Sequence, residues 1–284
     1  MRKQKIDFSK MTNREFFKLA NCTTKGWVRE RCLEHATPQQ CEHLAMYGEA
    51  NYGETNKVAA MFAKKLLPTA TPEQCVTLAC CGKTYKVAMM FAKKLLPIAT
   101  PDQCEDLASD GKTGRIAMMF AEKLLPVATR EQCVYLSMYG KTRTIAMMFA
   151  RKLLPIATPE ECQQIATNLR GRVDAIAMMF AKKLLPIATS EQCRVLIDNG
   201  KTEGIITMFA KKLLPTATPD WCEHYAKYGR TSEVAMMFAR RLLPDATFEQ
   251  CKSIVSGIGY EEVKEIFREK LKEFPEKRYY EQFL

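Results

Sequence analysis

One stretch of the chain recurs at a nearly constant interval, and this recurrence restricts the possible folds more than any other feature. Residues 71–99 read TPEQCVTLACCGKTYKVAMMFAKKLLPIA and return, edited, at 100–128 and 129–157. Self-similarity at a period of roughly 20–50 residues is the signature of stacked repeats. Copies begin at Thr37, Thr71, Thr100, Thr129, Thr158, Thr189, Thr218 and Thr247, in steps of 34, 29, 29, 29, 31, 29 and 29 residues.

Each copy is expected to fold as two helices. Thr71, Pro72 and Gln74 supply an N-cap, a proline at the first helical position and the third residue of a capping box, so a helix begins here. This first helix ends at Gly82, and Thr84 can cap a second one. The second helix, VAMMFAKKLLP, is apolar almost all round, which indicates burial by its own partner helix and by both neighbouring copies.

The sequence therefore predicts an all-α fold, a right-handed α-solenoid of about nine stacked two-helix repeats with a period of ~29 residues and degenerate caps at both ends. We assign residues 1–36 to an N-terminal lead-in and capping hairpin, 37–246 to seven two-helix repeats, and 247–284 to a C-terminal capping hairpin and tail. Extra residues in the turns of the copies at Thr37 and Thr158 indicate that this edge of the solenoid faces outward. We expect a monomer.

The cysteines predict a reducing compartment. Eight of the 12 occupy one repeated position of the first helix: Cys41, Cys75, Cys104, Cys133, Cys162, Cys193, Cys222 and Cys251. Stacked helices lie ~8–10 Å apart, which is too far for disulfides, so we interpret these residues as small buried thiols. The first ten residues contain no apolar signal segment, and no run approaches the ~20 apolar residues of a membrane span. We expect an intracellular protein of the cytoplasm, nucleoid or nucleus, or one delivered into a cell, without membrane partners.

A cation directly follows the turn glycine in six copies: Lys83, Lys112, Lys141, Arg172, Lys201 and Arg230. Stacking would place these side chains in a row at one edge, where the first N–H groups of the second helices can also accept an anion. Together with a net charge of +11 and a pI near 9.0, this row predicts phosphate binding. The alternative is that Gly-Lys-Thr is turn and cap chemistry, with lysine present for solubility.

The two residues before each turn glycine change from copy to copy: Cys80 and Cys81, Ser109 and Asp110, Met138 and Tyr139, Leu169 and Arg170, Asp198 and Asn199, Lys227 and Tyr228. Variable residues beside a row of cations suit a surface that holds phosphates and reads bases. We therefore predict that these pairs face the bases of a nucleic acid. The alternative is ordinary variation of an exposed turn.

A second row of cations lies late in the second helices, at Lys64–Lys65, Lys93–Lys94, Lys123, Arg151–Lys152, Lys182–Lys183, Lys211–Lys212 and Arg240–Arg241. Cations near a helix C-terminus are favoured by the helix dipole whatever the protein binds. We therefore favour a role in stability for this row, and contact with a bound partner is the alternative.

The residues give no support for catalysis. Gly-Lys-Thr lacks the preceding strand and the glycine five residues earlier that a P-loop requires, and no Ser/His/Asp or Cys/His arrangement stands apart from the repeat. The three histidines, His35, His43 and His224, are scattered, and no C-x-x-C pair is present. We therefore expect no enzyme, no catalytic residue, no metal and no cofactor.

The repeat resembles that of transcription-activator-like effectors and their bacterial relatives. The resemblance lies in T-P-E-Q, then L-A, two variable residues, Gly-Lys and L-L-P, over about 37–246. In that family an α-solenoid wraps duplex DNA, the variable pair reads bases and the Gly-Lys segment contacts phosphates. The resemblance implies phosphate contacts for Lys83, Lys112, Lys141, Lys201 and Arg230, and base contacts for the variable pairs.

The sequence thus favours non-enzymatic binding of nucleic acid, with DNA preferred over RNA. The main alternative is a protein-interaction scaffold or effector that uses its concave helical face, as the tetratricopeptide, HEAT and ankyrin arrays do. An enzyme on a repeat scaffold, like the helical-repeat DNA glycosylases, would need an isolated pocket acid or base, and the sequence offers none.

Overall fold

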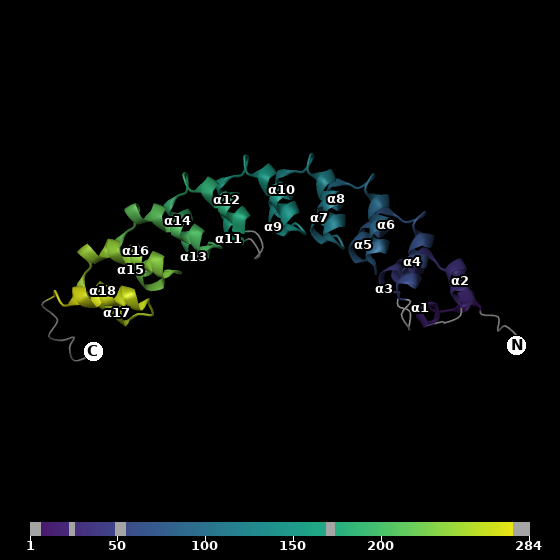
Figure 1. Cartoon of the computed structure of the whole chain (residues 1–284), viewed down its shortest axis with the longest axis horizontal. Coiled ribbons are helices and arrows are strands. Elements are labelled where there is room, and N and C mark those ends of the chain that lie inside the picture. Colours follow the sequence, from purple (N-terminus) through teal and green to yellow (C-terminus); the bar gives the residue numbers. More distant parts are fainter. Residues whose placement is uncertain (1–6, 23–25, 49–54, 169–173, 275–284) are drawn as a thin grey trace. The chain divides into compact units, whose positions relative to one another are not determined.

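A computed structural model describes residues 7–22, 26–48, 55–168 and 174–274, and all regular structure in these ranges is helical (Figure 1). The first helices of the hairpins, called A helices, are α1 (Asn13–Cys22), α3 (Pro38–Tyr47), α5 (Pro72–Cys81), α7 (Pro101–Asp110), α9 (Arg130–Tyr139), α11 (Pro159–Asn168), α13 (Ser190–Asn199), α15 (Pro219–Tyr228) and α17 (Phe248–Ser256). The second, B helices, are α2 (Gly26–His35), α4 (Thr55–Leu66), α6 (Tyr85–Leu95), α8 (Gly114–Leu124), α10 (Arg143–Leu153), α12 (Asp174–Leu184), α14 (Glu203–Leu213), α16 (Ser232–Leu242) and α18 (Glu261–Leu271). Short 3₁₀ turns are η1 (Phe8–Lys10), η2 (Leu214–Thr216) and η3 (Leu243–Asp245).

The chain forms two compact units, Met1–Lys152 and Leu153–Leu284, called unit 1 and unit 2. In unit 1, α3 packs on α4, α5 on α6 and α7 on α8, and the A helices also pack on one another in chain order. In unit 2 the same hairpin pairing joins α11 to α12, α13 to α14, α15 to α16 and α17 to α18. The predicted all-α stack of two-helix repeats is therefore confirmed. The division into terminal caps and central repeats remains a prediction.

Every repeat buries the same side chains. In the hairpin of α5 and α6, Cys75, Leu78, Phe91 and Leu95 are all at most 1% exposed. Their equivalents in the other repeats are buried to the same degree, including Phe62, Phe120, Phe149, Phe180, Phe209 and Phe238. A phenylalanine ring at the same buried position adds a similar apolar area to the core of each repeat. The core is therefore a series of equivalent contacts along the chain rather than one central cluster.

The predicted helix starts are confirmed at the threonines. Thr71 accepts a hydrogen bond from the N–H of Gln74, and the Gln74 side chain accepts one from the N–H of Thr71, which completes a capping box. In α11, Glu161 takes the glutamine's place. The predicted caps of the second helices also form, at Thr84, Thr113, Thr142, Thr202 and Thr231.

The turn glycine is required for space rather than for an unusual backbone conformation. Gly82 has φ −50° and ψ 135°, which other residues adopt readily. A Cβ atom at this position would lie 2.5 Å from the Leu78 carbonyl oxygen and 3.1 Å from the Ala88 nitrogen. Both neighbours are backbone atoms that cannot turn aside, so a side chain here would force the two helices of the hairpin apart.

Two kinds of hydrogen bond join successive repeats, as the hairpin of α5 and α6 illustrates. The backbone N–H of Lys83, just after the turn glycine, donates to the Ala45 carbonyl of the preceding A helix at 2.9 Å. At the other end of the hairpin, the Lys94 ammonium donates to the carbonyl oxygens of Leu67, Pro68 and Ala70 at 2.5, 3.1 and 2.9 Å. These carbonyls end the preceding B helix and have no partner inside it.

The same lysine bond recurs along the array. The donors are Lys65, Lys94, Lys123 and Lys152 in unit 1 and Lys183 and Lys212 in unit 2. Each donor is the second residue of its predicted cation pair. Lys123 has the same position but follows Glu122 instead of a cation. The first residue of each pair, such as Lys93, is exposed. The stability role predicted for this row thus belongs to one residue of each pair.

We expect Lys94→Met to lower the free energy of unfolding by about 1–3 kcal/mol, because three carbonyl oxygens would lose their donor in a partly buried place. Methionine keeps the length of the apolar stem, so the loss reports mainly on the hydrogen bonds. Urea unfolding followed by circular dichroism measures it. The control is Lys93→Met on the adjacent, exposed side chain, which should stay within about 0.5 kcal/mol of wild type. Equal effects of the two substitutions would contradict the assignment.

Candidate interaction surfaces

The turn cations of unit 1 lie in successive repeats. The backbone N–H groups of Lys112 and Lys141 donate to Ala79 and Ala108 at 3.1 and 3.0 Å, which fixes each turn against the preceding A helix. Their side chains are exposed, whereas that of Lys83 is half-buried. Lys112 and Lys141 therefore occupy corresponding exposed positions in successive repeats, and anion binding by this row remains a prediction.

The turn cations of unit 2 differ from one another. Lys201 is exposed. The Arg230 guanidinium instead donates through Nη1 to the carbonyl oxygens of Asp198 and Gly200, both at 3.0 Å, and so ties its repeat to the preceding turn. Arg172 lies outside the described residues, as do Leu169 and Arg170 of one variable pair.

The two members of each variable pair have different environments. The first is buried or half-buried at Cys80, Ser109, Met138 and Lys227, and the second is exposed at Cys81, Asp110, Tyr139 and Tyr228. In α13 both members, Asp198 and Asn199, are exposed. Consecutive residues of a helix point about 100° apart, so where one member packs beside the neighbouring A helix the other faces solvent. The second members are thus the better placed of these candidates to touch a partner.

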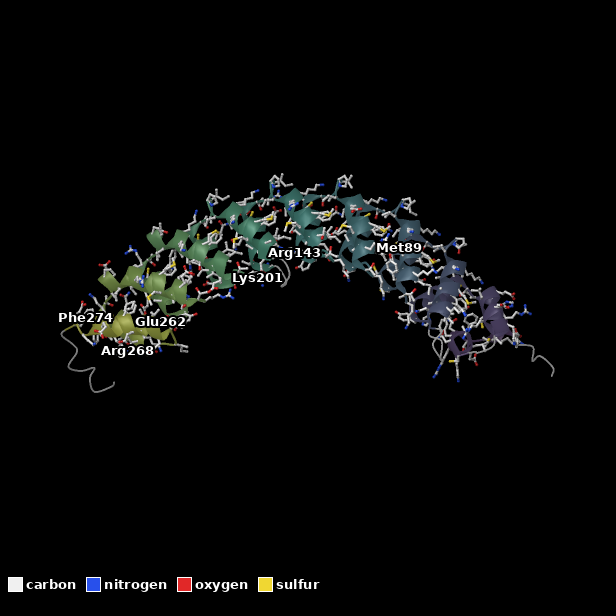
Figure 2. The ribbon with its side chains drawn as sticks, viewed as in Figure 1. Met89, Arg143, Lys201, Glu262, Arg268 and Phe274 are labelled. Atoms are coloured by element: carbon white, nitrogen blue, oxygen red, sulfur yellow. The ribbon has the colours of Figure 1, made fainter. Side chains whose placement is uncertain are left out.

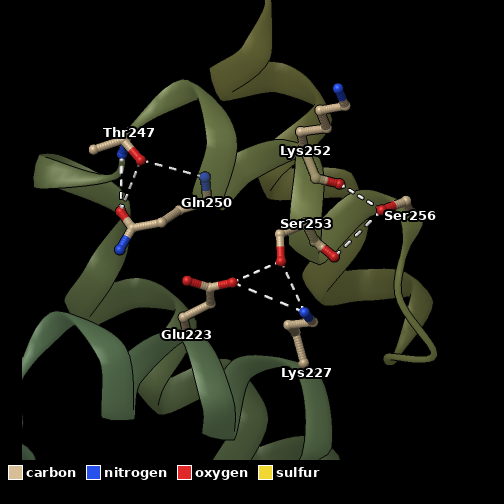
Figure 3. Close-up of polar contacts among 7 residues, drawn as sticks. All are labelled: Glu223, Lys227, Thr247, Gln250, Lys252, Ser253 and Ser256. Atoms are coloured by element: carbon tan, nitrogen blue, oxygen red, sulfur yellow. Dashed lines mark hydrogen bonds and ion pairs between the residues drawn. The ribbon is translucent and has the colours of Figure 1, made fainter.

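Lys227 shows how an inward-facing first member is used. Its Nζ donates to the Ser253 hydroxyl at 2.8 Å and lies 3.8 Å from Glu223 Oε1, and the same hydroxyl donates to that carboxylate at 2.6 Å (Figure 3). This triangle joins α15 to α17. Lys227 is therefore part of a contact between repeats, beside the exposed Tyr228.

A set of exposed residues that the sequence analysis did not single out lies one turn before the second variable residue. In three A helices the ring at this position contacts the ring four residues later. The pairs are His43 with Tyr47, Tyr135 with Tyr139, and His224 with Tyr228, at ring-centroid distances of 5.1, 5.0 and 5.4 Å. Phe17 of α1 stacks on His43 at 3.9 Å. These positions, together with Thr77, Cys81, Asp106 and Asp110 in unit 1, are called the helix A surface. Helical i, i+4 spacing was the signal that could have revealed them.

The exposed charges of four A helices of unit 1 are acidic, and two of them, Asp106 and Asp110, belong to the helix A surface. Among the exposed side chains of α3, α5, α7 and α9, all that carry a full charge at pH 7 are carboxylates: Glu73, Asp102, Asp106, Asp110 and Glu131. Asp106 and Asp110 lie one turn apart on α7, next to the turn that carries Lys112. A phosphate at this edge would meet both the turn cations and these carboxylates, and like charges repel at such distances.

A polar cleft of about 550 Å³ lies at the turn edge of unit 2. It is lined by Thr167, Asn168, Val195, Asp198, Asn199, Gly200, Lys201 and Arg230. It therefore brings one predicted base-facing pair together with two predicted phosphate ligands. Residues of both charge signs line it, because the exposed Asp198 is among the lining residues together with the two cations.

The buried cysteines do not form disulfides, and all 12 lie within the described residues. Burial raises the pKa of the repeated thiols, and a nearby lysine such as Lys94 beside Cys75 partly opposes this. Burial also raises the pKa of Cys80 in the variable pair to about 11. A raised pKa leaves little thiolate near neutral pH, so these thiols are poor nucleophiles. Within the described ranges no cluster of His, Cys, Asp or Glu could hold a metal ion.

Thiol labelling tests this assignment. At pH 8 in native buffer, we expect a disulfide reagent to modify the exposed Cys22 and Cys81 first. The repeated cysteines should react at least about tenfold more slowly, since they are both buried and protonated. Mass spectrometry of tryptic peptides identifies the sites, and urea-unfolded protein gives the reference rate. Labelling of Cys75 or Cys104 at the rate of Cys81 would contradict the buried ladder.

Comparisons with known proteins add little. No family model matches the sequence, and no similar curated protein is found. Among solved structures, the chain is similar to a Sel1 repeat protein from Oxalobacter formigenes, at 8% identity and a TM-score of 0.29, over 100% of this chain and 98% of that one. A TM-score this low carries no weight for function. Separately, none of the described helices combines the length and apolar character that a membrane span requires.

Proposed function

We propose that this chain is a non-enzymatic protein-interaction scaffold that binds a protein partner on the helix A surface of unit 1. The observation that carries the proposal is the chemistry of one structural position across repeats. The same two exposed sites hold His43 and Tyr47 in α3, Asp106 and Asp110 in α7, and Tyr135 and Tyr139 in α9. A constant frame that presents different side chains suits recognition of one extended partner by several repeats.

The aromatic pairs supply the affinity in this proposal. Tyr135 and Tyr139 are 38% and 39% exposed, with their rings in contact. Tyrosine offers a large, rigid and amphipathic contact area at low entropic cost, and it is enriched at interface hot spots. The carboxylates of α7 lie on the same layer and would select a partner segment with complementary positive charge.

Nucleic acid is the second candidate, favoured by the exposed Lys112 and Lys141 in successive repeats and by the resemblance to transcription-activator-like effectors. It ranks lower because the neighbouring exposed charges of the A helices are carboxylates. In either case we propose that residues 1–36 and 247–284 cap the array. In α18 the charged face pairs internally, for example Arg268 with Glu261 and Glu265, while Val263 and Phe267 are buried.

Peptides selected from a random phage-displayed library against the immobilised full chain test the proposal. We expect a selected peptide to lose about 30-fold or more in affinity on Tyr135→Ala/Tyr139→Ala, since central aromatic residues dominate interface energies. Fluorescence anisotropy with the labelled peptide measures the loss. The control is Tyr85→Ala, which removes a ring of similar exposure, 44%, from the B helix α6.

A salt series on random duplex DNA separates the two candidates. If nucleic acid is the partner, binding should weaken by about 0.9 log units per phosphate contact for each tenfold rise in salt. It should also be lost when Lys83, Lys112, Lys141 and Lys201 are changed to Ala. The scaffold proposal expects neither. Failure to select any peptide, or equal losses for the α9 and Tyr85 variants, would count against it.

A further inference from the structure

Four B helices of unit 1, α4, α6, α8 and α10, carry exposed charge that is mostly opposite in sign to that of α3, α5, α7 and α9. Among the exposed charged side chains of α4, α6, α8 and α10, all are cations except Glu122. Apart from Lys65, whose ammonium bonds to the preceding repeat, they are Lys57, Lys64, Lys86, Lys93, Arg115, Arg143 and Arg151. Figure 1 shows these four helices side by side in one layer of unit 1, with α3, α5, α7 and α9 in the other.

A row of methionines runs between these cations. On α6, Lys86, Met90 and Lys93 follow the spacing i, i+4, i+7 and so share one face of the helix. Met90 is half-buried on this face, as are Met61, Met119 and Met148 on the neighbouring helices. Two labels in Figure 2 help to locate this row: Met89, the buried residue just before Met90 on α6, and Arg143, the cation at the start of α10. The four methionines and the seven cations listed above are called the helix B face.

Two further exposed apolar residues follow B helices of this unit. Ile98 and Val127 follow α6 and α8 after one turn and are 62% and 66% exposed. Exposed apolar residues gathered beside cations are typical of interaction sites rather than of plain solvated surface. Methionine side chains are flexible and polarisable, and they adapt to apolar anchors of a bound helix.

The spacing of the row indicates which shape fits it. Packed helices lie roughly 8–10 Å apart, so the methionines of successive repeats recur at about that interval. An α-helix rises ~1.5 Å per residue, so seven residues span ~10.5 Å. A helix laid across α4, α6, α8 and α10 would therefore bring a side chain over each methionine every seven residues. Roughly 20 residues would cover the whole face.

We propose that the helix B face of unit 1 binds an acidic amphipathic helix of a protein partner. Apolar side chains about one heptad apart contact Met61, Met90, Met119 and Met148, and carboxylates beside them pair with the surrounding lysines and arginines. The charge complementarity distinguishes this face from α3, α5, α7 and α9 of the same unit, whose exposed charges are carboxylates. In unit 2 the B helices carry exposed Glu203 and Glu233 among their cations.

This site is separate from the helix A surface, so each can fail without the other. A uniformly charged polyanion such as DNA would use the cations but not the methionines. An apolar partner without carboxylates would use the methionines but not the cations. The two kinds of substitution therefore distinguish the proposed occupant from both.

The test uses a synthetic, fluorescein-labelled helical peptide of about 21 residues. It carries Leu at positions seven apart, Glu beside each Leu and Ala elsewhere. A second peptide has the same composition with the Leu residues spread around the helix. We expect the first to bind the full chain by fluorescence anisotropy, and the second to bind at least about tenfold more weakly, since its apolar anchors cannot all face the protein.

Matched variants locate the contact. Lys86→Gln/Lys93→Gln/Arg115→Gln should weaken binding of the first peptide about tenfold or more, by loss of several ion pairs. Lys112→Gln/Lys141→Gln/Lys201→Gln removes the same net charge from the turns and should change binding less than about twofold. Met90→Gln/Met119→Gln keeps helix propensity and side-chain length, and it should also weaken binding about tenfold. Circular dichroism confirms that each variant is folded.

Methyl NMR on protein labelled at the methionine ε-carbons gives an independent reading. Addition of the first peptide should shift the signals of Met90, Met119 and Met148, and leave that of Met138 on α9 unmoved. The proposal is overturned if neither peptide binds at about 100 μM, if both bind equally, or if the turn variant is as defective as the helix B variant. It is also overturned if random duplex DNA binds this face and the peptide does not displace it.

Discussion

The array depends on one charged side chain per repeat that is used inside the structure. The ammonium of Lys94 donates to carbonyl oxygens at the end of the preceding B helix, and Lys65, Lys123, Lys152, Lys183 and Lys212 do the same in their own repeats. A helix end leaves carbonyls without partners, and the following proline cannot continue the helix. Each repeat thus completes its predecessor, which fixes both the spacing and the order of stacking. This requirement accounts for the lysine without reference to any ligand.

The same use of lysine changes how the net charge is interpreted. A charge of +11 suggests a polyanion as partner, but part of it neutralises helix ends within the array. In unit 1 the exposed remainder is divided in the repeats from α3 to α10, with carboxylates on α3, α5, α7 and α9 and mostly cations, beside methionines, on α4, α6, α8 and α10. The net charge of the chain does not show that charges of opposite sign lie on different helices. The repeats from α3 to α10 therefore carry two chemically distinct sets of exposed side chains, one on each helix layer.

Much of the fold followed from local signals. The threonine caps and the capping boxes were predicted within a single repeat, because these interactions join residues three or four apart, and the burial of Cys75 was predicted from its recurrence at one position in every copy. The candidate site was less accessible to prediction. The sequence marked both members of each variable pair and all turn cations alike, whereas the structure ties Arg230 to a neighbouring turn and Lys227 to Ser253. The aromatic pair of Tyr135 and Tyr139 lay within reach of sequence reasoning, since i, i+4 spacing places them on one face.

The sequence by itself determined that the chain is a periodic series of two-helix repeats, where each helix begins, and which residues form its core. Those features depend on contacts within a repeat, and the residues that make these contacts recur in every copy. Only the tertiary structure decided which of two adjacent residues faces a neighbour and which faces solvent, as with Lys93 and Lys94 or Met138 and Tyr139. Adjacent residues on a helix differ in direction by about 100°. The position of the next repeat decides which direction is buried, and no signal within one repeat specifies it.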